Sequence, residues 1–163
     1  MKKVTILVLL LVLFIAAATA TANPRSMYTA DLAGAFEVPA VITAATGEAF
    51  FRVSADGSSL GYRLNVRGLT DTLQGHIHMG PAGQNGPVVA FLYPDAPPAQ
   101  LIPGRFSGEL AGGAITADEL RGPLEGMTIA DLLAAIESGN AYVNVHTVAN
   151  PGGEIRGQIH SAN

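Results

Sequence analysis

The chain has 163 residues with no cysteine, 19 glycines and 10 prolines, and its formal net charge is −4 with neutral histidines. Without cysteine it has no disulfide, no thiolate metal site and no cysteine nucleophile. An acidic chain also lacks the basic surface that nucleic acids and anionic membranes require, so neither is expected as a partner.

The N-terminal residues have the pattern of a secretory signal peptide. Two lysines precede an apolar run over residues 4–18, and both Ala18-Thr19-Ala20 and Ala20-Thr21-Ala22 fit the small-x-small cleavage rule. The alternative is a retained membrane anchor, but the run is shorter than the ~20 apolar residues that span a bilayer. We predict a signal peptide over residues 1–22 and a secreted or periplasmic domain over residues 23–163.

The remaining chain is long enough for one domain with its own core, and its apolar residues alternate as in strands. The clearest alternation runs from Leu60 to Arg67 and follows Asp56-Gly57, a strong hairpin signal. These patterns predict an all-β domain, either an immunoglobulin-like or Greek-key β-sandwich or a partly closed barrel of seven or eight strands. The expected strands cover residues 27–36, 48–54, 60–67, 72–79, 88–93, 105–110, 141–148 and 154–160.

A short helical insertion is predicted over residues 116–138, between the late strands. Thr116 and Thr128 each have an acidic residue three positions later, which is the pattern of a capping box. After Thr128, apolar residues follow at helical spacing until Gly139, which ends the helix. We expect this insertion to cover one end or an open seam of the sheet.

Histidines mark the most site-like stretch of the sequence. His76 and His78 lie on one face of the expected strand 72–79, because side chains alternate along a strand. The same alternation places His146 on the polar face of the strand 141–148. If these two strands are neighbours, the three imidazoles converge on one outer wall of the sandwich. A loop rich in glycine, proline and asparagine, residues 80–87, follows His78.

Three imidazoles without a thiolate suit copper or zinc and leave a coordination position open. We therefore predict a metal site at His76, His78 and His146, with copper as the first choice and zinc as the second. The alternative interpretation is that surface histidines are simply polar, or that they order a loop through hydrogen bonds. No nucleophile elbow or pair of carboxylates at strand ends is evident, so no catalytic residue is predicted.

Three further polar residues near the end of the chain have open roles. Glu154 is a candidate for orienting a histidine, and His160 is expected on the surface because it lies three residues from the end. Arg156 either contacts an anion near the histidines or forms a salt bridge with Glu48, Glu154 or Asp71, and we favour the salt bridge.

Four segments of the sequence form a recognisable set: Ala35-Phe36-Glu37-Val38-Pro39, His76-Ile77-His78-Met79-Gly80, Asn140-Ala141-Tyr142-Val143-Asn144-Val145-His146-Thr147 and Asn150-Pro151-Gly152-Gly153-Glu154-Ile155-Arg156-Gly157-Gln158-Ile159. In these segments the sequence resembles the CHRD domain, a module of many secreted proteins. The resemblance implies an immunoglobulin-like sandwich or barrel and an extracytoplasmic location, without a firmly assigned biochemical activity.

A weaker similarity is to copper/zinc superoxide dismutase, in which a His-x-His strand, a later histidine and a late arginine also occur. The corresponding residues here are His76, His78, His146 and Arg156. The sequence departs from that pattern because residues 80–93 contain no bridging histidine or zinc-binding loop, and no cysteines are present. A complete bimetallic site is therefore excluded.

Three functional hypotheses result. The first is an exported binding module that holds copper or zinc through surface histidines. The second is a structural or adhesive extracytoplasmic module whose partner is a protein or a polysaccharide. The third is a mononuclear copper redox enzyme.

Overall fold

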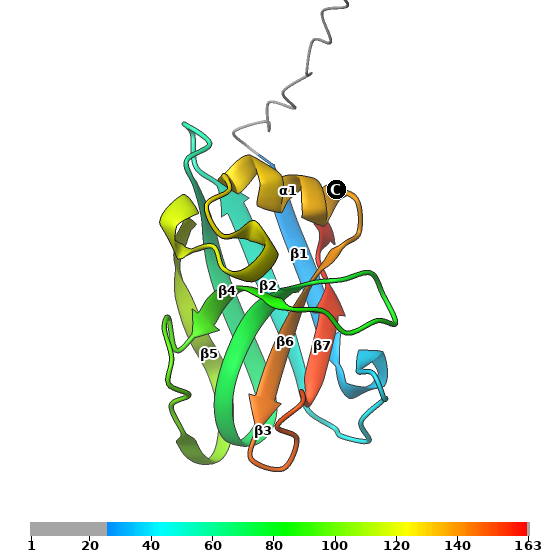
Figure 1. Cartoon of the computed structure of the whole chain (residues 1–163). Coiled ribbons are helices and arrows are strands. Elements are labelled where there is room, and N and C mark those ends of the chain that lie inside the picture. The colour runs from blue at the N-terminus through cyan, green and yellow to red at the C-terminus, as the bar shows by residue number, and fades with distance from the viewer. Residues whose placement is uncertain (1–25, 163) are drawn as a thin grey trace, which may run out of the picture.

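The computed structural model describes residues 26–162, so the predicted signal peptide lies outside the described residues. Eight strands, one α-helix and three short 3-10 helices make up this part of the chain (Figure 1). The strands are β1 Met27–Ala33, β2 Thr46–Val53, β3 Ser59–Met79, β4 Val88–Tyr93, β5 Ile102–Thr116, β6 Ala141–Thr147, β7 Ile155–Gln158 and β8 His160–Ser161, and the helix is α1 Ile129–Glu137. The 3-10 helices are Gly34–Phe36, Ala117–Glu119 and Gly122–Leu124.

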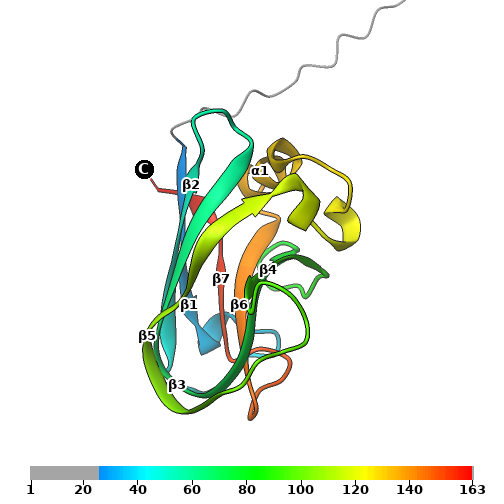
Figure 2. The same cartoon turned by 90° about the vertical axis from the view of Figure 1, so that its left-hand side faces the viewer.

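The strands form an antiparallel barrel that confirms the predicted all-β class. The order β2-β1-β7-β6-β3 closes because β3 also pairs with β2. β4 and β5 pair with β3 outside this ring, and the short β8 pairs with β1. Seen from the side, the strands form two layers, with β1, β2 and β5 on one side and β4, β6 and β7 on the other (Figure 2).

Strand β3 belongs to both layers. Its first part pairs with β2 and β5, and its last part pairs with β6 and β4. The sequence predicted two separate strands here, and that division is wrong because the chain bends without ending the strand (Figure 2). Gly68 and Asp71 have positive φ angles of 74° and 53° at the bend, where the register against β5 also shifts. Such irregularities bend a strand sharply without ending its pairing.

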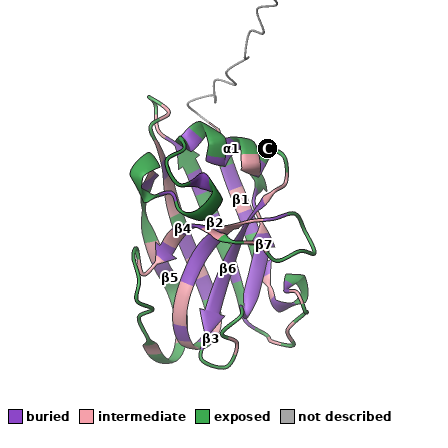
Figure 3. Ribbon diagram, viewed as in Figure 1, coloured by how far each residue is buried: buried purple, intermediate pink, exposed green. Residues whose placement is uncertain are grey.

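The core lies between the two layers and under α1. In the strands 60–67, 141–148 and 154–160 the apolar face predicted from alternation points inward. The most buried side chains of the core include Ala30, Leu32, Leu60, Leu64, Ile77, Val143, Val145 and Ile155. The helix covers one end of the barrel, as expected for the insertion, and buries Ile129, Leu132, Leu133 and Ile136 (Figures 1 and 3).

The predicted cap of α1 is present. Asp131 accepts hydrogen bonds from the backbone N–H of Thr128 at 2.9 Å and from its hydroxyl at 2.7 Å. The far end of the helix is tied to β1, where the Tyr28 hydroxyl donates to Glu137 at 2.9 Å. These contacts fix the helix over the barrel end. Among residues 26–162, no helix has the length and apolar character needed to cross a membrane.

Candidate metal centre

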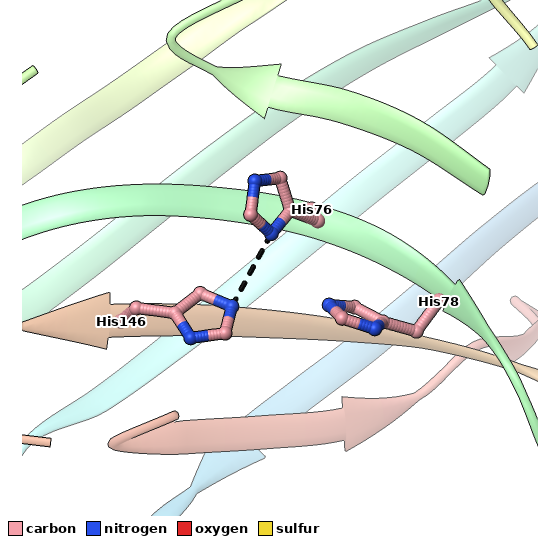
Figure 4. Close-up of side chains that lie close together, drawn as sticks. All are labelled: His76, His78 and His146. Carbon is pink, nitrogen blue, oxygen red and sulfur yellow. Dashed lines mark hydrogen bonds between the residues drawn. The ribbon is translucent and has the colours of Figure 1, made fainter. Parts of the chain in front are cut away.

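The three predicted histidines lie together on two neighbouring strands. β3 and β6 are antiparallel partners, with Gln74 opposite His146 and His76 opposite Asn144. His76 and His78 therefore point to the same side as His146, away from the barrel core (Figure 4). The sequence prediction required these two strands to be neighbours, and they are hydrogen-bonded partners.

The ring nitrogens are close enough to share one ion after a small movement. One candidate ligand atom from each of His76, His78 and His146 lies within 4.8 Å of the other two. Figure 4 shows nitrogens of the three rings directed into a common space. Three nitrogens that are each about 2.0–2.1 Å from one ion lie about 3.4–3.6 Å apart in tetrahedral or trigonal geometry. The most distant pair would therefore need to close by roughly 1 Å.

Backbone carbonyls determine which nitrogen of two rings carries the proton. His146 Nδ1 lies 3.0 Å from the Pro151 carbonyl oxygen, and His78 Nδ1 lies 2.9 Å from that of Gly86. A carbonyl oxygen only accepts, so both rings donate from Nδ1 and keep a lone pair on Nε2. Outer hydrogen bonds of this kind orient metal-binding histidines.

Two of the three lone pairs, on His76 and His78, are buried without a donor among the described residues. His76 Nδ1 lies 3.2 Å from His146 Nε2, and because the latter has only a lone pair, His76 donates to it. His76 Nε2 and His78 Nε2 are then buried acceptors, and neither has a hydrogen-bond partner among the described residues. A buried polar atom without a partner is unfavourable unless something else occupies its lone pair.

The histidines are more buried than the sequence indicated. His76 is 3% exposed and His146 is 5% exposed, so the expectation of surface histidines is wrong for these two. Their position on the outer face was predicted correctly, but a loop and neighbouring aromatic rings cover that face. The ring of His76 meets Phe91 edge-on at 5.0 Å, and His78 stacks on Tyr142 at 5.0 Å.

Burial keeps the three imidazoles neutral. Desolvation lowers the pKa of His76 to about 3, with the neighbouring histidines adding to the effect. It lowers the pKa of His146 to about 4, although the hydrogen bond to Pro151 acts in the opposite direction. Desolvation also lowers the pKa of His78, against the hydrogen bond to Gly86. Neutral imidazoles are the form that binds metal ions.

The β3–β4 loop, residues 80–87, covers His78. Gly86 joins the two, because its carbonyl accepts from His78 while its N–H donates to the Tyr142 hydroxyl at 3.1 Å. Only glycine fits at this position, since a Cβ on Gly86 would collide with the carbonyl of Met79. The loop that the sequence predicted thus places a backbone oxygen on the histidine.

Arg156 fixes the same loop through the hydrogen bonds of its guanidinium group. Its guanidinium donates to the carbonyls of Pro81 at 3.1 Å and Gln84 at 2.8 Å, and to Asn85 Oδ1 at 3.2 Å. The group also lies 3.4 Å above the ring of Tyr142, as in a cation–π contact. The favoured salt bridge is therefore wrong, because backbone carbonyls and an aromatic ring take the place of an acid.

The other polar candidates lie outside the histidine cluster. Glu154 accepts from Thr43 at 2.8 Å, Thr147 at 2.6 Å and Asn150 at 3.2 Å, which orders the β6–β7 turn rather than a histidine ring. His160 is exposed, as predicted.

A buried pair beside the centre was missed. Asn144 donates to Glu37 at 2.7 Å, and burial raises the pKa of Glu37 to about 7 although Asn144 and Arg156 favour its charged form. Alternation did place Asn144 and Tyr142 on the face of His146. The carbonyls of Gly86 and Pro151, in contrast, leave no pattern in a sequence.

Comparisons with known proteins agree with the resemblance drawn from the motifs. The sequence profile described as the CHRD domain matches residues 28–159. Chordin of Xenopus laevis is 29% identical over 140 residues, which are 81% of this chain and 13% of that protein. The chain thus corresponds to a small part of the length of this relative. No solved structure gives a significant match.

Proposed function

The chain belongs to the CHRD domain family, and we propose that this CHRD domain is an exported module that binds one copper ion through His76, His78 and His146. The observation that supports the proposal is the buried Nε2 of His78, which faces the other two rings and has no hydrogen-bond partner among the described residues. Leaving such an atom unpaired costs about 1–3 kcal/mol, and coordination of an ion would remove that cost.

The protein's own groups are arranged to assist such an ion. The Gly86 and Pro151 carbonyls hold the rings of His78 and His146 with Nε2 free. On binding, His76 would ligate through Nδ1, and its proton would move from Nδ1 to Nε2. The low pKa values mean that little proton competition exists at neutral pH.

Copper fits this environment better than zinc. Three imidazoles with an open position can hold either metal, so the choice depends on affinity and charge. Cu²⁺ exceeds Zn²⁺ in affinity for a given nitrogen site, and Cu⁺ carries a smaller desolvation cost because that cost rises with the square of the charge. Arg156, a cation in contact with Tyr142, further favours the lower charge. A bound copper ion would supply a redox-active centre with an open coordination position.

Isothermal titration of the purified protein with Cu²⁺ and Zn²⁺, and competition with a Cu⁺ chelator, tests the proposal. We expect one ion per chain, with copper bound more tightly than zinc. His76→Ala and His146→Ala each remove one of three ligands, so we expect affinity to fall about 100-fold.

The matched control is His160→Ala, which removes an exposed histidine outside the cluster and should leave the affinity unchanged. Absence of copper binding, or equal binding by His76→Ala and the unsubstituted protein, would show that the cluster is not a metal site. The histidines would then serve only to order the loop.

Export has a separate test. The intact mass of the protein recovered from its producing cells should correspond to a chain that lacks the predicted signal peptide, with its first residue near Asn23. A mass that includes residues 1–22 would contradict cleavage and favour a retained anchor.

A further inference from the structure

A recess outside the histidine cluster lies against β7 and the start of the chain's first loop. Its volume is about 490 Å³, within the range of small-ligand sites. The small and apolar part of its wall is formed by two loops, through Ala35 and Val38 of the first and Ala82 and Gly83 of the second. Its aromatic and polar lining consists of Asp31, Phe36, Glu37, Arg156, Gln158 and His160, and none of the three clustered histidines takes part.

Phe36 presents an apolar surface at this recess. Its side chain remains 56% exposed, although exposing a large aromatic ring to water is unfavourable. The ring belongs to the 3-10 helix Gly34–Phe36, which is anchored because the Gly34 carbonyl accepts from the backbone of Glu37 and Val41. The aromatic ring is therefore offered on a fixed support.

The polar groups of the recess retain unused hydrogen-bonding capacity. Arg156 is the exception, because it is only 1% exposed and its guanidinium donates to Pro81, Gln84 and Asn85, so that it affects the recess through its charge. Gln158 donates both amide hydrogens, to the carbonyls of Gly80 and Gly139, so its oxygen remains available as an acceptor. Asp31 is exposed at the rim. Acceptor atoms of Asp31 and Gln158 thus line the recess beside the positive charge of Arg156.

The charges disfavour an ionic ligand. An anion would meet the carboxylates of Asp31 and Glu37, while a cation would meet the guanidinium of Arg156. A neutral hydroxyl group avoids both conflicts, and it can donate to the acceptor atoms of Asp31 or Gln158. Adjacent hydroxyls on a ring with an apolar C–H face would also use Phe36. We propose that this recess binds a neutral saccharide unit of an extracytoplasmic glycan.

The proposal goes beyond copper binding and does not depend on it. Arg156 links the two regions, since it lines the recess and stacks on Tyr142, which in turn stacks on His78. The saccharide test therefore uses metal-free protein, so that its result and the result of copper titration remain independent.

The test is an NMR titration of ¹⁵N-labelled protein with cellotriose, maltotriose and N,N′,N″-triacetylchitotriose, each added separately. With at least one of them we expect saturable shifts of the amides of Ala82, Gly83 and Gln158. Phe36→Ala should weaken that binding about tenfold, because stacking on an aromatic ring is worth about 1 kcal/mol or slightly more. Asp31→Asn should weaken it less.

The matched control is Phe50→Ala, because Phe50 is an equally large ring on β2, 47% exposed and absent from the recess. It should leave the shifts unchanged. The proposal is overturned if none of the three saccharides gives saturable shifts at these amides. It is also overturned if the two phenylalanine variants behave alike, or if decanoate fills the recess while the saccharides do not.

Discussion

The two ends of β3 present outward side chains to very different surroundings. Near its start, Arg63 points away from the core, its side chain is 65% exposed, and it pairs with Glu109 at 3.3 Å. Near its end, His76 also points away from the core but is only 3% exposed. The difference arises from the cover, because the β3–β4 loop and Phe91 lie over the second half.

The comparison shows that alternation along a strand gives the direction of a side chain but not its access to water. Where the outer face is open, a charged pair such as Arg63–Glu109 contributes about 0–1 kcal/mol. Where a loop covers it, each polar group needs a partner, and the histidines receive backbone carbonyls. The same pattern of residues thus gives solvated surface in one layer and a candidate binding centre in the other.

The largest expected effect of a substitution comes from displacing the β3–β4 loop that covers His78. Gly86→Ala places a methyl group against the Met79 backbone, so the loop must move and release His78. We expect urea denaturation to show a loss of about 2–3 kcal/mol in the free energy of unfolding, together with weaker copper binding. Gly152→Ala is the control, because its Cβ would meet no atom within 4 Å. Equal stability of the two variants would mean that the loop is not held at Gly86.

A smaller effect separates the two arginines of the comparison. Arg156→Met removes hydrogen bonds to three loop groups and should cost about 2 kcal/mol of unfolding free energy. Arg63→Met, on the open half, should cost less than about 1 kcal/mol. Urea denaturation of both variants measures the two losses of unfolding free energy. Similar losses would show that burial under the β3–β4 loop does not increase the stabilisation that an arginine provides.

A pH dependence that only the covered half should show gives a further test of the comparison. Histidine in the unfolded chain has a pKa of 6.5, whereas folding lowers the pKa of His76 to about 3 and that of His146 to about 4. Below pH 6.5 the unfolded state binds more protons, so stability falls with decreasing pH by up to about 1.4 kcal/mol per unit for each group. Above pH 6.5 the two groups contribute no slope.

Urea midpoints measured between pH 7 and pH 4.5 check this slope, and His76→Phe should reduce it. Glu37 acts in the opposite direction, because its raised pKa of about 7 makes its contribution decline as pH rises from 4.5 through 7. Glu37→Gln should therefore steepen the loss toward acid. Midpoints that do not change with pH in any variant would contradict the buried, neutral state of the histidines.

Local patterns predicted much of this molecule. Alternation gave the strands and the shared face of His76, His78 and His146, and the pair Thr128 and Asp131 gave the start of α1. The features that local patterns could not predict depend on long-range backbone contacts. The continuity of β3 through Gly68 depends on pairing with β5, and the partners of Arg156 are carbonyls that any residue possesses.

The continuity of β3 has a mechanical consequence. Because one strand is hydrogen-bonded in both layers, the layers cannot slide past or separate from each other without breaking its ladder. Leu64 in one layer and Ile77 in the other are both fully buried on this strand. Their amides should therefore exchange with deuterium at the same rate, by opening of the whole barrel, so that strain applied to either face is carried by the entire domain.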